Sequence, residues 1–295
     1  MKILVIYNPV AGGGKEQQLQ KFIAALVKRG AEVELYRTRH AGDAIDYLKG
    51  RDDQGDCVVA VGGDGTTNEV INGVKPGVPV GLFATGTANV LVKELALPGN
   101  AEMAAEVVMH GHTLNIWPAR LNGRRFCMWV GLGYDARVVH GADMELKKKI
   151  GKGAYALSML REVLHFGQQR YRLHIDGRPY DCCSAILANG QHYGGSFVLS
   201  RLADITRQSI QVILFQRTSR WALLSFMFAL LFGRAESING VLSLAAQRVE
   251  LISPEGEVLQ MDGDPAPPTP ALVEVDHEPL PVRVSATLAR KHGVE

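Results

Sequence analysis

The chain has 295 residues, enough for one large domain or for two ordinary domains of roughly 100–200 residues each. Apolar residues make up 46% and charged residues 21%, which excludes a disordered chain. The 32 Lys and Arg residues nearly balance the 30 Asp and Glu residues, and this net charge of +2 argues against a nucleic-acid-binding protein. None of the four cysteines forms a CxxC pair, which is typical of free thiols in a reducing compartment.

The first third of the chain alternates strand patterns with helix patterns. Short apolar runs predict strands over residues 3–7, 33–36, 57–61 and 80–83. Helices are predicted over residues 19–27, 41–48 and 102–110, from residue 66 onward, and between Gly86 and Pro98. Continuous apolar strands are typical of a parallel sheet covered on both faces, so we expect an open α/β sheet here.

After about residue 112 the pattern changes to short apolar–polar segments separated by turn residues. Strands are predicted over residues 126–130, 171–175, 182–188, 210–215, 249–252, 258–261 and 272–275. Asp176-Gly177 predicts a hairpin, residues 265–270 a loop, and residues 144–166 and 217–232 helices. We therefore expect a β-sandwich or a pair of antiparallel sheets. The expected domains are residues 1–115 and 116–279, with residues 280–295 able to pack back onto the first.

Three strand-to-helix junctions of the first domain carry residues suited to binding phosphate. They are Asn8 through Lys15, Gly62 through Asn68, and Gly86-Thr87-Ala88-Asn89. Glycines let a phosphate approach the backbone, and helix N-termini present free N–H groups. The carboxyl ends of neighbouring parallel strands meet at one edge, so we expect one shared ligand crevice. Two interpretations of Asp64 stay open: it holds Mg²⁺ or orients a hydroxyl, or it caps its own helix.

These junctions are followed in chain order by Tyr193-Gly194-Gly195 and Asp262-Gly263-Asp264. In this series the sequence resembles the diacylglycerol kinase catalytic-domain family, in its bacterial two-domain form of soluble lipid kinases. The resemblance implies a first domain like phosphofructokinase and NAD kinase, a β-sandwich second domain and ATP in the cleft between them. It also implies Mg²⁺-dependent transfer of the γ-phosphoryl group of ATP to the hydroxyl of diacylglycerol or a related lipid, giving a phosphatidate-like product.

The resemblance further implies roles for individual residues. The implied nucleotide-binding set is Asn8, Lys15, Thr38, Gly62, Gly63, Asp64, Gly65, Thr66, Thr67, Asn68, Thr87 and Asn89. The implied catalytic set is Asp264, Asp64 and Asp262. Asp264 stands where the family has Glu and is expected to accept the proton of the lipid hydroxyl. A second, structural Mg²⁺ site of the family is not expected, because Arg207 occupies an Asp position and a cation cannot ligate Mg²⁺; Asp204 is the only candidate to compensate.

An apolar run extends from Trp221 to Phe232 between Arg217, Arg220 and Arg234. It is shorter than the roughly 20 residues of a spanning helix. It predicts either docking at a membrane surface or burial against the sandwich, and a homodimer contact also fits. The lysines at 147–149 and 152 suit either anionic lipid or a solvated helix face. We expect a cytoplasmic protein that associates peripherally with the membrane.

Two other functions stay open beside the leading one. Within the enzymes, sphingoid-base kinase activity remains, whereas the Gly86–Asn89 junction and the Tyr193-Gly194-Gly195 segment disfavour an NAD kinase. Outside them, Asp264 and Arg207 motivate a catalytically weak regulator that binds nucleotide or lipid.

Overall fold

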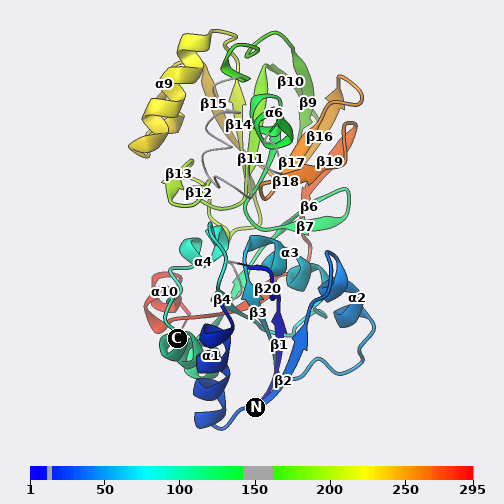
Figure 1. The fold of residues 1–295 in the computed structure, drawn as a ribbon. Coiled ribbons are helices and arrows are strands. Elements are labelled where there is room, and N and C mark those ends of the chain that lie inside the picture. Colours follow the sequence, from blue (N-terminus) through cyan, green and yellow to red (C-terminus); the bar gives the residue numbers. More distant parts are fainter. Residues whose placement is uncertain (12–14, 142–161, 295) are drawn as a thin grey trace. The chain divides into compact units, whose positions relative to one another are not determined.

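The structure is a computed structural model, and it describes residues 1–11, 15–141 and 162–294. The chain divides into two compact units, which are Met1–Trp117 with His277–Glu295, and Pro118–Asp276. The first is an α/β unit and the second is mainly β, so the predicted fold class is confirmed (Figure 1). The lysines at 147–149 and 152, and most of the helix predicted over residues 144–166, lie outside the described residues.

The first unit is built on one six-stranded sheet. Its order is β2 (Glu32–Arg37), β1 (Lys2–Tyr7), β3 (Cys57–Gly62), β4 (Val80–Ala84), β20 (Leu280–Val284) and β5 (His112–Ile116). Neighbouring strands run parallel except for the antiparallel pair β20 and β5. The strand β20 thus returns from the far end of the chain to lie beside β4 (Figure 1).

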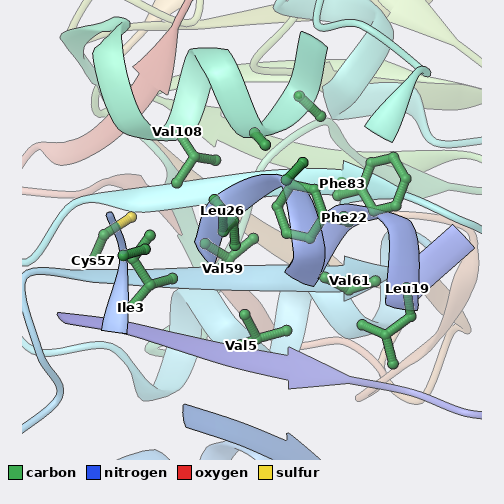
Figure 2. Packing of buried hydrophobic residues seen from close by; sticks show 14 of the residues in the cluster. Ile3, Val5, Leu19, Phe22, Leu26, Cys57, Val59, Val61, Phe83 and Val108 are labelled. Atoms are coloured by element: carbon green, nitrogen blue, oxygen red, sulfur yellow. The ribbon is translucent and has the colours of Figure 1, made fainter. Parts of the chain in front are cut away.

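Six helices accompany this sheet in the described part of the first unit. They are α1 (Glu16–Lys28), α2 (Asp43–Lys49), α3 (Asp64–Gly73), α4 (Val90–Glu94), α5 (Ala101–His110) and α10 (Ala286–Lys291). On α1, Leu19, Phe22 and Leu26 recur at helical spacing and are fully buried. Figure 2 shows this stripe against the apolar side chains of the sheet. The rings of Phe22 and Phe83 stack with centroids 4.6 Å apart, so α1 is fastened beside β4.

The second unit holds two six-stranded antiparallel sheets. One has the order β10 (Arg178–Cys182), β9 (Tyr171–Ile175), β16 (Arg248–Ser253), β19 (Ala271–Val275), β6 (Ala119–Leu121) and β7 (Arg124–Phe126). The other has the order β15 (Val241–Ala246), β14 (Ile210–Phe215), β11 (Ser184–Ala188), β8 (Trp129–Leu132), β17 (Leu259–Met261) and β18 (Asp264–Ala266). The described part also contains a small hairpin of β12 (His192–Tyr193) and β13 (Phe197–Val198), the helices α6 (Tyr134–Gly141) and α9 (Arg220–Leu231), and the 3₁₀ helix η2 (Ala235–Ser237).

Three predictions of single elements were wrong in detail. The strand expected over residues 126–130 is two strands, because β7 ends at Phe126 and β8 begins at Trp129 in the other sheet. The strand expected over residues 182–188 is interrupted at Cys183, where the chain passes from one sheet to the other. The loop expected over residues 265–270 begins within β18, which pairs with β17. An apolar run does not reveal in which sheet each of its residues will pair.

Candidate active site

Two of the predicted glycine junctions touch through their backbones in the first unit. They follow β3 and β4, which are neighbours in the sheet. The amides of Thr85 and Gly86 both donate to the carbonyl of Gly62, at 2.8 and 3.2 Å. A side-chain Cβ at Gly86 would lie 2.5 Å from the Cα of Gly63, far inside van der Waals contact. The two glycines therefore permit an approach that no other residue allows.

The Asp64 carboxylate joins these junctions. It accepts backbone hydrogen bonds from Asn89 at 2.8 Å and from Val90 at 2.6 Å, at the start of α4. Burial raises the pKa of Asp64, and these two donors act in the opposite direction. The sequence leaves two roles open for Asp64, binding a metal or hydroxyl and capping its own helix, and the observed contacts are different from both. Asp64 caps the next helix along the chain, α4, and no side-chain hydrogen bond caps its own helix α3.

Glu69, also on α3, makes the same kind of contact in another direction. Its two carboxylate oxygens accept the amides of Gly42 at 2.9 Å and Ala44 at 3.1 Å, at the start of α2. Gly42 has a left-handed φ of 87°, which favours glycine at this point of the chain. The helix α3 thus fixes the starts of two other helices through its carboxylates, α2 after β2 and α4 after β4.

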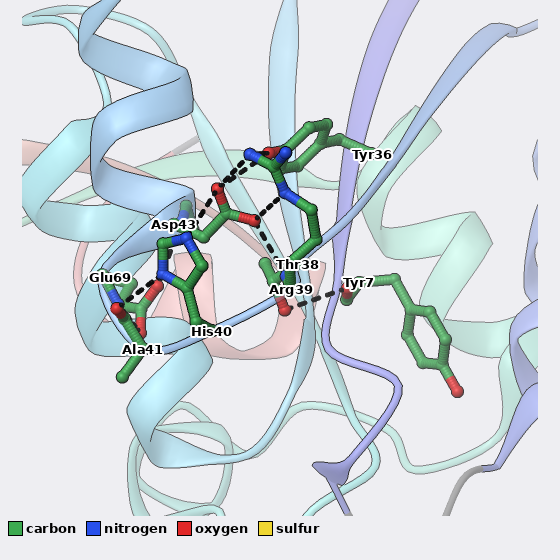
Figure 3. Close-up of polar contacts among 10 residues, drawn as sticks. Tyr7, Tyr36, Thr38, Arg39, His40, Ala41, Asp43 and Glu69 are labelled. Carbon is green, nitrogen blue, oxygen red and sulfur yellow. Dashed lines mark hydrogen bonds and ion pairs between the residues drawn. The ribbon is translucent and has the colours of Figure 1, made fainter.

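A third cluster lies after β2, close to the predicted nucleotide residue Thr38 (Figure 3). Thr38 is largely buried, and its hydroxyl donates weakly to the carbonyl of Tyr7 at 3.4 Å. Beside it, Asp43 bonds the Arg39 guanidinium at 2.9 and 3.1 Å and the Tyr36 hydroxyl at 2.9 Å. The hydrogen bond from Arg39 holds the pKa of Asp43 well below its usual value. The Arg39 side chain is 73% exposed, so this is an oriented, accessible cation at the carboxyl-terminal edge of the sheet.

The remaining residues predicted to bind nucleotide differ in their exposure. Gly65 and Thr87 are exposed at the two junctions, whereas Thr66, Thr67 and Asn68 are buried in α3. Asn8 accepts the amide of Val10 through its side chain at 2.9 Å and so shapes the turn after β1. Lys15 lies at the start of α1.

Several buried polar atoms at this edge have no hydrogen-bond partner among the described residues. They are Thr66 Oγ1, Thr85 Oγ1 and Asn89 Oδ1. All three belong to, or adjoin, the two interlocked junctions. Buried polar atoms are normally hydrogen-bonded, so this set favours a polar ligand close by.

In the second unit, Asp262-Gly263 forms the tight turn between β17 and β18. Met261 pairs with Asp264 across the hairpin, and Asp262 and Gly263 have left-handed φ values of 52° and 89°. The Asp262 carboxylate accepts the backbone amides of Cys127, Met128 and Trp129 at 3.1, 2.9 and 3.1 Å. Asp264 is exposed. The two aspartates therefore differ: Asp262 anchors the turn to the start of β8, and Asp264 faces solvent, where it can accept a proton.

Comparison with known proteins identifies the family. Residues 2–120 match the diacylglycerol kinase catalytic domain, and residues 128–285 match the YegS C-terminal NAD kinase beta sandwich-like domain. The chain belongs to the family that combines these two domains.

Curated relatives of this family member include the "Diacylglycerol kinase" of Staphylococcus aureus (strain MRSA252). It is 31% identical over 183 residues, which are 60% of this chain and 58% of the relative. The "Diacylglycerol kinase" of Staphylococcus carnosus (strain TM300) is 30% identical over 183 residues, which are 60% of this chain and 59% of the relative. The match thus spans less than two thirds of the length of these relatives.

Two solved structures share the fold. A diacylglycerol kinase from Bacillus anthracis has a TM-score of 0.80 at 24% identity, covering 97% of this chain and 98% of that chain. An NAD kinase from Archaeoglobus fulgidus in complex with ATP has a TM-score of 0.57 at 14% identity, covering 99% of this chain and 96% of that chain. At these identities the likeness concerns the fold alone.

Within the described ranges, no group of three His, Cys, Asp or Glu side chains could hold a metal ion. Both oxygens of Asp64 already accept backbone N–H groups. Asp204, the candidate to replace the family's structural metal ligand, forms an ion pair with Arg207 at 3.3 Å and accepts the Thr206 hydroxyl at 2.7 Å. These side chains by themselves do not fit a protein-built Mg²⁺ site.

The apolar run 221–232 is buried on one face of α9 and exposed on the other, so burial is confirmed for one face and membrane contact stays a prediction. Leu223, Phe226 and Ala229 are buried, and the Phe226 ring packs against Phe215 with centroids 4.5 Å apart. On the opposite face Trp221 is 79% exposed and Phe228 is 65% exposed, and Leu231 and Phe232 are exposed as well. Across the described residues no helix has the length and apolar character needed to cross a membrane.

The sequence analysis did not predict two polar residues that lie close to these motifs, one in each unit. Arg39 directly follows Thr38 and precedes Asp43 by four residues, a spacing that could have indicated an oriented cation. Asp135 follows the Gly133-Tyr134 pair at the start of α6 and is buried in the second unit. A carboxylate directly after a glycine turn at a helix start is the only signal for it in the sequence.

Proposed function

We propose that the protein is an ATP-dependent lipid kinase that phosphorylates the hydroxyl of diacylglycerol or a related lipid. The observation that carries this proposal is the pair of interlocked glycine junctions after β3 and β4, with buried polar atoms that lack partners among the described residues. Such an edge of an α/β sheet is suited to nucleotide phosphates. The diacylglycerol kinase catalytic domain matched over residues 2–120 supports the same function.

In this proposal the first unit binds ATP and the second supplies the acceptor chemistry. The exposed backbone at Gly65 and the Thr87 hydroxyl bind phosphate oxygens, and the Arg39 guanidinium adds positive charge at the same edge. The described side chains do not build a Mg²⁺ site by themselves, so the metal is expected to arrive with the nucleotide phosphates. Asp64 as a metal ligand stays a prediction.

Asp264 is proposed to accept the proton of the lipid hydroxyl. It is exposed next to a turn that is fixed at Asp262 by three backbone amides. Phosphoryl transfer depends mainly on positioning and on charge stabilisation, so a carboxylate one methylene shorter than Glu can act if the turn places it correctly.

The exposed face of α9 is proposed to contact the membrane that holds the lipid. Trp221 and Phe228 stand out from this face, and Arg217 and Arg220 lie at the N-terminal end of the helix. Aromatic and arginine side chains together suit the headgroup region of a bilayer. An anionic phospholipid surface is therefore the expected occupant, and a second copy of this chain is the alternative outcome.

The test is transfer of label from γ-labelled ATP, with Mg²⁺, to lipids in vesicles. Vesicles contain diacylglycerol or sphingosine, and soluble NAD is a separate acceptor. We expect labelled phosphatidate, lost in Asp264→Asn and kept in the control Asp181→Asn. Asp181 is a matched control because it is also an exposed hairpin aspartate of the second unit, 3.0 Å from Arg172.

Each result of this assay decides between named functions. Label only in sphingosine or only in NAD would replace the proposed acceptor. Calorimetric binding of ATP without turnover on any acceptor would favour the regulator. Full activity of Asp264→Asn would remove that residue from the role of base.

A further inference from the structure

A buried chain of hydrogen bonds connects two separate motifs of the second unit. Asp135 is 4% exposed, and its carboxylate accepts the hydroxyl of Tyr193 on one oxygen and the side-chain amide of Gln260 on the other. Gln260 is fully buried, and its carbonyl oxygen accepts the backbone amide of Gly263 at 2.9 Å. This series of hydrogen bonds therefore connects the Tyr193-Gly194-Gly195 segment with the turn that precedes Asp264.

The backbone around Asp135 is shaped to admit its carboxylate. A Cβ at Gly131 on β8 would lie 1.7 Å from one oxygen of Asp135 and 2.7 Å from the side-chain nitrogen of Gln260. No side chain at this position is compatible with the network. Glycine in a strand interior weakens the strand, so its use here indicates that the space is needed for the carboxylate.

The same turn is held from a second side. The Trp129 amide donates to Asp262, and the Trp129 ring packs against the Tyr193 ring with centroids 4.9 Å apart. Tyr193 is therefore joined to the turn twice, once through ring packing and once through Asp135 and Gln260.

Stability alone does not account for Asp135. Among the described residues it has no ion-pair partner, and burial raises its pKa to about 6. A buried carboxylate without a cation is costly, and apolar residues of similar volume usually serve stability as well. Carboxylates perturbed in this way are concentrated at functional sites, which favours a functional role for Asp135.

We propose that Asp135 is a positioning residue, which sets the place of Asp264 through Gln260 and Gly263 and holds the Tyr193-Gly194-Gly195 segment beside it. This inference rests on the proposed function, because the turn matters chemically only if Asp264 is the proton acceptor. Asp264 follows Gly263 directly, so movement of the Gly263 amide moves the carboxylate. An error of about 1 Å at a reacting group can cost on the order of 100-fold in rate.

The test compares two buried glutamines of the same sheet. Gln260→Leu removes the link between Asp135 and the turn. Gln211→Leu on β14 removes one side-chain bond to Ser243, 2.6 Å long, and does not contact the turn. We expect kcat for lipid phosphorylation to fall roughly 10- to 100-fold in Gln260→Leu, with the KM for ATP within about twofold of wild type. Gln211→Leu keeps the wild-type kcat.

A second readout does not depend on activity. Hydrogen–deuterium exchange of the peptide that covers residues 259–266 should be faster in Gln260→Leu than in the wild type and unchanged in Gln211→Leu. If Gln260→Leu does not fold, Tyr193→Phe replaces it, since it removes one donor to Asp135 and leaves the ring in place. For Tyr193→Phe we expect faster exchange in the same peptide and a smaller fall in kcat.

Unchanged exchange in the turn overturns the inference, and so does a kcat equal to that of Gln211→Leu. A wild-type protein without turnover on any lipid refutes the proposed function instead. In that case the exchange measurement still decides whether Asp135 and Gln260 hold the turn.

Discussion

The contact between the two glycine junctions makes Gly86→Ala the most direct test of the nucleotide site. The added Cβ would lie 2.5 Å from Gly63 Cα and 2.8 Å from Asn89 Oδ1. Carbon atoms in ordinary contact are about 3.5–4.0 Å apart, so the junctions must separate by roughly 1 Å. Overpacking of this kind costs about 1–3 kcal/mol. At roughly 2–4 °C for each kcal/mol, Tm should fall by about 2–12 °C.

Gly65→Ala in the same motif should behave in the opposite way. A Cβ at Gly65 meets nothing within 4 Å, and alanine in a helix is up to about 1 kcal/mol more favourable than glycine. Its Tm should therefore stay equal to the wild type or rise. Its affinity for ATP should nevertheless fall, because the methyl group covers the exposed start of α3 where the phosphates are proposed to bind.

Differential scanning calorimetry and calorimetric titration with ATP and Mg²⁺ measure the two effects separately. Gly99→Ala is the control, since its Cβ also meets nothing within 4 Å and Gly99 lies outside the junctions. A Gly86→Ala protein that melts with the wild type would refute the contact between the junctions. A Gly65→Ala protein that binds ATP as tightly as Gly99→Ala would remove the start of α3 from the nucleotide site.

Three further predictions concern the second unit. On α9, Phe226→Ala should lower the free energy of unfolding in urea by about 3–5 kcal/mol, because the Phe226 ring packs against Phe215. Phe228 is exposed, so Phe228→Ala should lower this free energy by less than about 0.5 kcal/mol. The same Phe228→Ala change should reduce the fraction of protein that sediments with anionic vesicles. Asp276→Asn should lower the free energy of unfolding by about 3–5 kcal/mol, because it removes the carboxylate beside the buried Arg125. Burial acts to raise the pKa of Asp276, but hydrogen bonds from Arg120 and Arg125 lower it overall. The wild type should therefore be more stable than the variant above about pH 4, and this difference should be lost as pH falls below that value. Burial raises the pKa of Asp135 to about 6, so its contribution to stability is fully present below about pH 4, where the carboxyl is neutral, and is lost as pH rises through 6. Between pH 4 and pH 7 the free energy of unfolding of Asp135→Asn should therefore rise by up to about 3 kcal/mol relative to that of the wild type. A difference between the two proteins that does not depend on pH would contradict this.

The sequence by itself determined the fold class and the places of the glycine junctions. Continuous apolar runs such as residues 57–61 predict buried parallel strands, and the alternation in residues 171–175 predicts a half-buried antiparallel strand; both are observed as β3 and β9. These properties are local, because they depend on side-chain period and on residues that end a strand or helix. For the same reason the hairpin at Asp176-Gly177 was predicted correctly.

Only the tertiary structure decided what the polar residues of these junctions contact. Asp64 was expected to meet a metal ion or its own helix, and its partners are amides 25 and 26 residues further along the chain. The Asp135 network joins residues more than a hundred positions apart, from α6 to β17, and no spacing in the sequence indicates it. Likewise, only the tertiary structure distinguishes the two faces of α9, because one face packs against a sheet and the other is exposed. A helix that is apolar all round carries no periodic signal of which side is buried.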